Sequence, residues 1–284
     1  MAKILVIGRV NLDRIWRLNA PLRSGGRTAY HGVETRFGGG GFSSSRVLAA
    51  CGHHVAVLTS FADDAAGRGC RKALEELGVD TSFIEMRSGE TVPVEVFLDP
   101  AGERTILGYV GRGAYYPDFP AADFDLIYVN AHRLNEQILA GLDRAPHVVS
   151  QFPLSRERHP ARTLIASGSD VTASAEALWA EASGIAGPQL RHVIRTRGAG
   201  AVELIEETSN VDVGIEIAEG VVDTIGAGDF FAAGYVDGLM RGQSSVDAIR
   251  HGASIAGRWL RTAPARTPGD LELRGARPRA AALD

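Results

Sequence analysis

Cysteine, aromatic residues and concentrated positive charge are all scarce in this sequence of 284 residues. Its two cysteines, Cys51 and Cys70, show no C-x-x-C spacing, which excludes a disulfide framework and favours a reducing compartment, so we expect the cytoplasm. The 30 Lys and Arg are scattered among 34 Asp and Glu, and we therefore expect no nucleic-acid partner. The opening apolar run, KILVIG, is too brief for a signal peptide or a bilayer span, and we expect no membrane partner.

Apolar segments that alternate with helical patterns indicate the fold class. Continuous apolar runs of the kind found in parallel sheets occupy residues 3–8, 54–61, 126–131, 147–152 and 192–198. Helical patterns occupy residues 44–52, 68–78 and 134–145. Strands that alternate with helices predict an α/β fold with right-handed crossovers, and we expect residues 1–284 to form a single domain.

Two stretches depart from this alternation, at residues 12–37 and 91–110. Both are rich in β-forming residues, and DPAGER, at 99–104, is typical of a hairpin turn. They predict a small accessory sheet over the main one. The last residues, 261–284, are rich in Arg, Pro and Ala and show little periodicity, so we expect them to be peripheral.

The most informative stretch is DTIGAGDFFAAG, at residues 223–234. Gly226, Ala227 and Gly228 allow a turn whose N–H groups stay uncovered, and a helix is expected from Phe230 onward. Such a turn binds anions, because its amides and the helix N-terminus converge where phosphate oxygens can sit. A carboxylate beside a phosphate suits a general base in phosphoryl transfer, which would be Asp229. A helix cap is the plainer alternative for this residue.

This stretch resembles the C-terminal signature of the ribokinase-like, or PfkB, carbohydrate kinases. The resemblance implies that Asp229 is the catalytic base and that the backbone amides of Ile225, Gly226, Ala227 and Gly228 hold the transition-state charge, with Thr224 and Ile225 close to the nucleotide. It also implies a fold, namely a central, mostly parallel sheet flanked by helices, with a small β-sheet lid formed by approximately residues 12–37 and 91–110. ATP and Mg²⁺ are the expected cofactors.

A second signature of this family, a Gly-Gly pair before a helix, is resembled by FGGGGFSSSRVLAACG, with Gly38 and Gly39 as the pair. Ser43 stands where ribokinases usually carry an Asn that binds a sugar hydroxyl. Upstream, GRVNLD resembles the family's Gly-x-x-x-x-Asp, which makes Asn11 and Asp13 acceptors for vicinal hydroxyls of a polyol. A simple turn is the alternative for Asn11 and Asp13.

Softer matches point to the nucleotide side. IRTRGAGAVEL resembles the family's Thr-x-Gly-x-x-Gly segment, so the candidates for nucleotide binding are Thr196, Arg197 and Gly198. A solvated arginine at a strand end explains Arg197 equally well. DVTASAEAL resembles the family's Asn-x-x-Glu, with Ala173 in place of the Asn, and this leaves Glu176 as an indirect magnesium residue.

The resemblance implies an ATP-dependent kinase of a small sugar or sugar derivative. A nucleoside kinase of the same fold stays open, and so does a catalytically silent sensor of a sugar or nucleoside, which the changes at Ser43 and Ala173 motivate. Activation by a monovalent cation and a homodimer through the lid, both found among relatives, also stay open. Arginines in or near the lid segments could receive a phosphorylated sugar, namely Arg9, Arg36, Arg104 and Arg112.

Two other chemistries are disfavoured. Gly39-x-Gly41 lacks the third glycine of a dinucleotide fingerprint and does not directly follow the first strand. Cys51, His53 and His54 do not give the spacing of a tetrahedral metal site, and a turn between a helix and a strand explains them.

Overall fold

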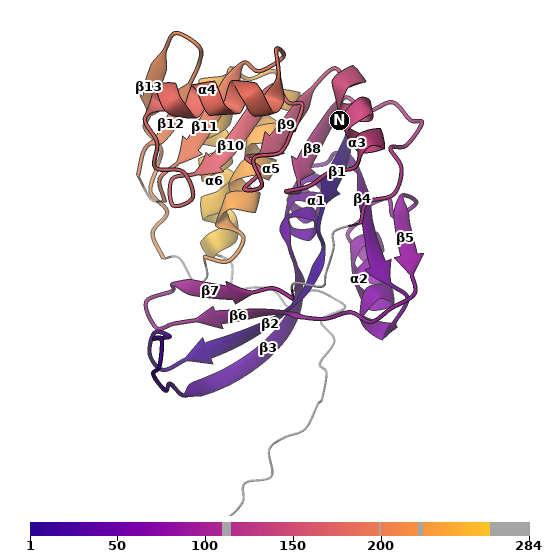
Figure 1. Ribbon diagram of the computed structural model, residues 1–284, viewed down its shortest axis with the longest axis vertical. Coiled ribbons are helices and arrows are strands. Elements are labelled where there is room, and N and C mark those ends of the chain that lie inside the picture. Colours follow the sequence, from indigo (N-terminus) through magenta and orange to yellow (C-terminus); the bar gives the residue numbers. More distant parts are fainter. Residues whose placement is uncertain (110–114, 199, 221–223, 262–284) are drawn as a thin grey trace, which may run out of the picture.

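A mixed sheet with helices on both faces forms the body of the computed structural model (Figure 1), which describes residues 1–109, 115–198, 200–220 and 224–261. Within these ranges the sheet has nine strands in the order β13-β12-β11-β10-β9-β8-β1-β4-β5. Their bounds are β1 Lys3–Gly8, β4 His54–Ala62, β5 Ile84–Arg87, β8 Leu126–Asn130, β9 Val148–Gln151, β10 Thr163–Ser167, β11 His192–Thr196, β12 Val202–Ile205 and β13 Asn210–Val213.

The strands from β11 to β5 in this order pair in parallel, and β12 and β13 add antiparallel partners at one edge. All five apolar runs that we expected to be strands are strands. The sequence pattern missed β5, β10, β12 and β13, which are short. Because parallel strands end at one edge, the carboxyl ends of β1, β8, β10 and β11 gather on the same side of the sheet.

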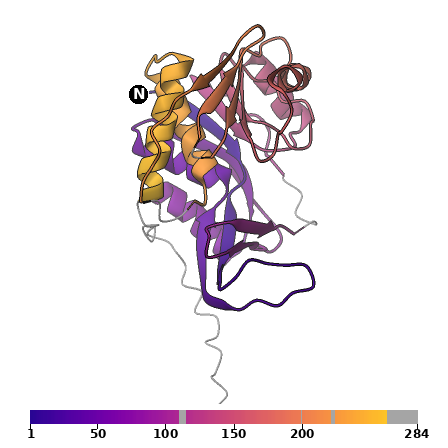
Figure 2. The same cartoon turned by 90° about the vertical axis from the view of Figure 1, so that its left-hand side faces the viewer.

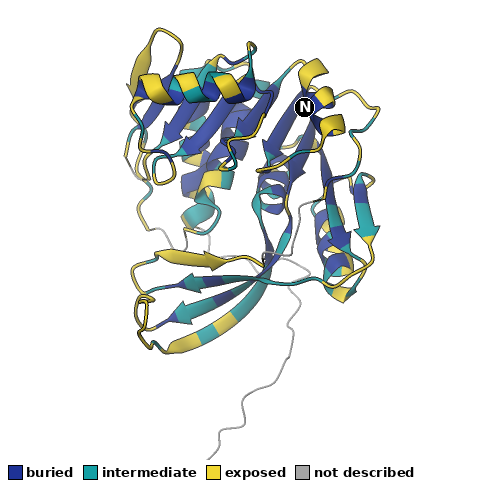
Figure 3. Cartoon of the chain, in the orientation of Figure 1, coloured by how far each residue is buried: buried dark blue, intermediate teal, exposed yellow. Residues whose placement is uncertain are grey.

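Helices cover both faces of the sheet and so bury its central strands (Figures 1 and 3). Ile4 and Val6 of β1 belong to the apolar core under α1, α2, α5 and α6, whereas Leu5 and Ile7 belong to the core under α3 and α4. The helices are α1 Gly40–Ala50, α2 Ala65–Glu76, α3 Glu136–Arg144, α4 Ala175–Ala186, α5 Ala227–Met240 and α6 Ser245–Arg261. In the described part of the chain, none of them combines the length and apolarity of a membrane span.

A second sheet projects from the edge where the parallel strands end (Figures 1 and 2). In the described ranges it has four strands in the order β3-β2-β6-β7, with bounds β2 Asn11–Leu18, β3 Tyr30–Gly38, β6 Val94–Leu98 and β7 Arg104–Leu107. β2 pairs with β6 in parallel, and the other pairs are antiparallel. The predicted hairpin turn is confirmed, because Asp99 and Glu103 are bonded across it. We call this second sheet the lid.

The two faces of the lid differ in character. Ile15, Val96 and Leu98 form a small buried cluster on the inner face, against which Ile225 of the main body packs. On the outer face the ring of Trp16 stacks on Phe97 at 6.2 Å. Exposed side chains are frequent on the outer strands of the lid (Figure 3).

α5 begins at Ala227 rather than at Phe230, so the prediction of its first residue was wrong; Ala227, Gly228 and Asp229 already lie in the helix. The cause is Gly226, whose left-handed φ of 84° completes the turn within one residue. The expected peripheral tail and Arg112 lie outside the described residues.

Candidate active site

The N-terminus of α5 meets the edge at which β1 and β8 end. Asp229 lies in the first turn of this helix and Gly226 is its N-cap residue. The first amides of a helix have no acceptor within the helix, and the macrodipole gives this end a partial positive charge. The amide of Ala227 donates to the carbonyl oxygen of Thr224 at 3.2 Å, which closes the turn. A carboxylate and the amides that the sequence analysis named as candidates for anion binding therefore share one corner of the molecule.

Asp229 is held by a residue that sequence analysis did not single out. Nδ2 of Asn130, the last residue of β8, donates to Oδ1 of Asp229 at 2.8 Å. Burial raises the pKa of the Asp229 carboxyl to about 6, although the bond from Asn130 and the charge of Arg104 act to lower it. A carboxylate with such a pKa is largely ionised at neutral pH and is a better proton acceptor than an ordinary aspartate.

Tyr128 and Gln151 support Asn130 through hydrogen bonds. Its Nδ2 also lies 3.2 Å from the phenol oxygen of Tyr128, which accepts from Nε2 of Gln151 at 3.0 Å. Tyr128 is fully buried, and burial raises its pKa, so the phenol stays neutral. A Cβ at Gly40 would lie 2.1 Å from Cγ of Asn130, so glycine there makes room for this amide. The four residues form a fixed platform under Asp229.

The predicted acceptor residues come together beside this platform. Asn11 and Asp13 lie in β2, directly opposite Gly38 and Arg36 of β3. A Cβ at Gly38 would lie 2.0 Å from Oδ2 of Asp13, and one at Gly39 would lie 3.0 Å from Nδ2 of Asn11. Asp13 is buried and Asn11 is partly exposed. The two glycines thus allow the two polar side chains to lie directly against the backbone.

The same glycine run continues into the main body. The amide of Gly41 donates to the carbonyl oxygen of Arg9 at 2.8 Å, and a Cβ at Gly41 would lie 2.7 Å from the carbonyl oxygen of Gly8. Ser43 lies in the first turn of α1, where its amide donates to the carbonyl oxygen of Gly39 at 3.0 Å. Close approach between β1 and α1, rather than a dinucleotide turn, therefore explains these glycines.

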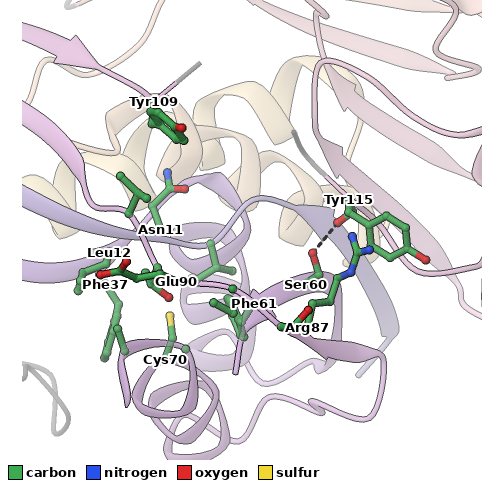
Figure 4. Close-up of a pocket in the computed structure, with 18 residues that line it drawn as sticks. Asn11, Leu12, Phe37, Ser60, Phe61, Cys70, Arg87, Glu90, Tyr109 and Tyr115 are labelled. Carbon is green, nitrogen blue, oxygen red and sulfur yellow. Dashed lines mark hydrogen bonds between the residues drawn. The ribbon is translucent and has the colours of Figure 1, made fainter. Parts of the chain in front are cut away.

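A cavity of about 290 Å³ adjoins Asn11 (Figure 4). Its wall carries aromatic side chains and also a few polar groups from the ends of β4 and β5. Arg87 lies over the ring of Tyr115 at 3.7 Å, and Oγ of Ser60 donates to the Tyr115 carbonyl oxygen at 2.8 Å. The labelled lining residues are Asn11, Leu12, Phe37, Ser60, Phe61, Cys70, Arg87, Glu90, Tyr109 and Tyr115.

The predicted nucleotide residues lie farther along the same edge of the sheet. Thr196 ends β11, and Gly198 follows it with a left-handed φ of 60°. The guanidinium of Arg197 lies 2.9 Å from carboxylate oxygens of both Glu203 and Asp212, so ion pairs to β12 and β13 hold it.

Glu176 is exposed in the first turn of α4, and hydrogen bonds from its own backbone amide and from Ser174 lower the pKa of its carboxyl. Magnesium ligation by the protein alone is not supported, because the described residues contain no group of three or more His, Cys, Asp and Glu that could hold a metal ion. Glu176 is a single exposed carboxylate, and Ala173 offers no side-chain ligand. This donor set fits a magnesium ion only where phosphate oxygens and water supply most of its ligands.

Asn130 is the chief site residue that the sequence analysis missed, although a signal existed. It is the polar end of the otherwise apolar run LIYVN, at the carboxyl end of a parallel strand. Tyr128 and Gln151 gave no signal, because tyrosine is common in strands and glutamine is common at strand ends.

A carboxylate held at a helix N-terminus, at the carboxyl edge of a parallel sheet and beside a β lid, fits a phosphotransferase that acts on hydroxyl groups. Comparison identifies the family: the model of the pfkB family of carbohydrate kinases matches residues 1–139 and 166–268, and the chain belongs to this family. It is accordingly a carbohydrate kinase, a phosphotransferase that acts on an alcohol group.

Individual relatives match the chain over most of its length, and the solved structures share its fold. The ribokinase of Haemophilus influenzae is 22% identical over 278 residues, which cover 89% of this chain and 90% of that protein. The crystal structure of ribokinase from Cryptococcus neoformans in complex with ADP matches with a TM-score of 0.75 at 22% identity, over 93% of this chain and 95% of that one. A nucleoside kinase from Burkholderia thailandensis in complex with inosine matches with a TM-score of 0.71 at 15% identity, over 91% of each chain.

Proposed function

We propose that this protein is an ATP-dependent kinase that transfers the γ-phosphoryl group to a hydroxyl of a small sugar or sugar derivative. The observation that carries the proposal is the carboxylate of Asp229, which is fixed by Asn130 at 2.8 Å in the first turn of α5. The ADP complex of a fungal ribokinase with the same fold supports ATP as the donor.

The mechanism follows from what each side chain can do. Asn11 and Asp13 bind hydroxyls of the acceptor, with Gly38 and Gly39 leaving room for these two side chains against the backbone, and Ser43 offers a further hydroxyl from α1. Asp229 takes the proton of the attacking hydroxyl while that oxygen bonds to the γ-phosphorus and the bond from this phosphorus to the ADP oxygen breaks.

The turn before α5 stabilises the transferring group. The amides of Ile225, Gly226, Ala227 and Gly228 are the candidates to bind the γ-phosphoryl oxygens, for which the Ala227 amide would exchange its bond to the Thr224 carbonyl oxygen. Thr224 with Thr196, Arg197 and Gly198 forms the nucleotide side. When bound, Mg²⁺ would supply positive charge that offsets the charge of the phosphates, and Glu176 is the residue that would hold it, through water.

The cavity beside Asn11 favours a second candidate, a nucleoside acceptor. Phe37, Phe61, Tyr109 and Tyr115 line this space of about 290 Å³, and planar bases stack on aromatic rings. The inosine complex of a bacterial nucleoside kinase with the same fold is consistent with such an acceptor.

A coupled ADP-release assay tests the function. Pentoses, hexoses, acidic keto sugars, sugar phosphates and nucleosides are offered with MgATP, in the presence and absence of K⁺, to wild type and to Asp229→Asn. Turnover that Asp229→Asn abolishes supports the kinase. Measurable binding of a sugar or nucleoside without turnover in any case would instead establish a silent sensor.

We further propose that residues 1–284 form one ribokinase-like domain whose lid segments, approximately 12–37 and 91–110, cover the acceptor. The outer lid face, with Trp16 and Phe97 stacked and the ring of Tyr30 edge-on at 4.8 Å from Trp16, suits a homodimer contact between lids. The free thiols of Cys51 and Cys70 support a cytoplasmic location. Sedimentation of wild type and Trp16→Glu tests the dimer.

A further inference from the structure

A reciprocal pair of hydrogen bonds joins the lid to the turn before α5. Nη1 of Arg104, in β7, donates to the carbonyl oxygen of Thr224 at 3.1 Å. Oγ1 of Thr224 donates in return to the carbonyl oxygen of Gly102 at 3.2 Å. A lid guanidinium is therefore anchored at the edge of the turn whose amides are the candidates for anion binding.

The surrounding structure fixes the side of the lid from which Arg104 extends. Arg104 lies directly opposite Leu98 in the antiparallel pair of β6 and β7, and directly opposed residues share one face. Leu98 belongs to the inner cluster against which Ile225 packs. The hairpin is stiffened by Asp99, whose carboxylate accepts two backbone N–H groups of the turn at 2.9 Å each. Arg104 thus faces the site from a well-defined position.

Arg104 differs from two other lid arginines, Arg14 and Arg17, in the group to which it donates. Arg14 pairs with Glu95 and Arg17 pairs with Glu34, so carboxylates within the lid neutralise both charges. The bond from Arg104 goes to a backbone carbonyl, which carries no full charge. Its positive charge acts on Asp229, whose pKa it lowers, and the side chain is exposed.

We propose that Arg104 is a catalytic residue, a lid-borne cation that contacts the transferring γ-phosphoryl group beside the amides of residues 225–228. The inference rests on the kinase function proposed above. During phosphoryl transfer the negative charge spreads over the equatorial oxygens, and a planar guanidinium matches two of them at once. Because the lid carries Arg104, the charge is in place only when the lid covers the acceptor, which ties transfer to enclosure.

Two other roles for Arg104 predict different behaviour. A structural latch between lid and turn would affect the position of the lid and hence the KM of the acceptor. A receptor for a phosphorylated or acidic sugar would affect the binding of anionic acceptors alone. A catalytic contact acts on the transferring group itself, whatever the acceptor is.

The test measures binding of Mg²⁺-ADP alone, and of Mg²⁺-ADP with aluminium fluoride as a mimic of the transferring group, by calorimetry on the full chain. Arg104→Gln keeps a donor for the Thr224 carbonyl but removes the charge. We expect its affinity for ADP to change less than about threefold and its affinity for ADP with aluminium fluoride to fall about 10²–10³-fold. Arg104→Lys keeps the charge but loses the planar guanidinium, so its affinity for ADP with aluminium fluoride should lie between that of the wild type and that of Arg104→Gln.

The matched control is Arg14→Gln, which removes the same charge from the opposite face of the lid. We expect it to bind both ligands as the wild type does. Equal affinity of wild type and Arg104→Gln for the mimic would overturn the assignment and leave the kinase proposal standing. So would a loss confined to the KM of the acceptor or to anionic acceptors. A wild type that binds neither ADP nor the mimic would refute both the proposed function and this inference.

Discussion

Asn130 at the carboxyl end of β8 donates a hydrogen bond of 2.8 Å to Asp229 in the first turn of α5. This bond selects the orientation of the carboxylate and lowers its pKa against the effect of burial. Replacing Asn130 by Ala should therefore lower kcat by about 10- to 100-fold, because the base is no longer held in line. Asn130→Asp should move the apparent pKa of the base upward by at least about one unit, because two carboxylates then share one site.

The pH dependence of kcat/KM distinguishes a change in the pKa of Asp229 from a general loss of folded structure. In both variants the acid limb should shift toward higher pH, whereas a variant that only loosens the fold would lower the plateau and leave the limb in place. Asn19→Ala is a control, because Asn19 lies on the lid, bonded to His31, outside the proposed site. An unchanged limb in Asn130→Asp would show that Asn130 does not act on the base.

The direction in which wild-type activity changes with pH follows from the pKa of Asp229. Its pKa of about 6 lies above the ordinary 3.8, and the ionised form is the one that accepts a proton. Activity should therefore be nearly complete above pH 7 and should fall as the pH drops through about 6, roughly tenfold per unit below it. A limb near pH 4 would mean that Asp229 is better solvated than the structure indicates.

Asp229→Asn should separate activity from stability. Loss of the base lowers kcat by about 10²–10⁴-fold, with little change in the affinity for ADP. A raised pKa means that the folded state prefers the protonated acid, so its favourable contribution is complete below pH 3.8 and is lost as the pH rises through about 6. At pH 7.5 the ionised carboxylate opposes folding, and the neutral amide should increase the free energy of unfolding by up to about 3 kcal/mol.

Thermal and urea unfolding of both proteins at pH 7.5 and pH 5 measure this effect. The advantage of Asp229→Asn should shrink at pH 5, where the wild-type acid is largely protonated. A variant less stable than the wild type at both pH values would contradict the stated cause of the pKa shift.

The sequence predicted those parts of this protein that depend on local pattern. The apolar runs gave five of the parallel strands, namely β1, β4, β8, β9 and β11, and Gly226 and Gly228 indicated a turn before a helix. The alternation of strands and helices could not predict β12 and β13, because no helix separates these two short antiparallel strands at the edge of the sheet. Sequence patterns also could not place Asn130 against Asp229, since a contact between residues 99 positions apart depends on how β8 and α5 pack.

Gly40 is a second residue whose role depends on a contact that the sequence pattern could not predict. The run GGGG resembles the family's Gly-Gly pair through Gly38 and Gly39 and gives Gly40 no role, but in the structure a Cβ at Gly40 would lie 2.1 Å from Cγ of Asn130. Gly40→Ala should therefore push the amide off Asp229 and lower kcat by about 10- to 100-fold, much as Asn130→Ala does. Kinetics of Gly40→Ala, Asn130→Ala and the double variant test this, because effects that pass through one contact are not additive.

Gly184→Ala provides the matched control. Gly184 lies within α4, and nothing lies within 4 Å of the position that a Cβ would take. The variant should keep its activity and gain about 0.5–1 kcal/mol, as glycine in a helix interior is unfavourable. Fully additive effects of Gly40→Ala and Asn130→Ala would show that Gly40 acts elsewhere.

The far end of α5 carries a buried charge whose role is structural. Asp237 is 1% exposed and accepts from Nε2 of His53 at 2.8 Å, from Nε2 of His251 at 2.6 Å and from Nε of Arg241 at 2.9 Å. These partners lower the pKa of its carboxyl below the ordinary 3.8. Asp237→Ala should destabilise the fold by about 3–5 kcal/mol, because it leaves a cation and two imidazoles without their shared acceptor.

The contribution of Asp237 to the free energy of unfolding depends on pH in the opposite direction to that of Asp229. A depressed pKa contributes stability that is complete above pH 3.8 and is lost only as the pH falls through the lower folded-state value. The difference between wild type and Asp237→Ala in urea unfolding should thus shrink as the pH falls below 3.8. Asp143→Asn, which removes an exposed partner of Arg158, should cost less than about 1 kcal/mol. Since Asp237 lies about 12 Å along the helix from Asp229, the folded variant should keep its kcat, and a kcat loss at full folding would mean that this cluster reaches the active site.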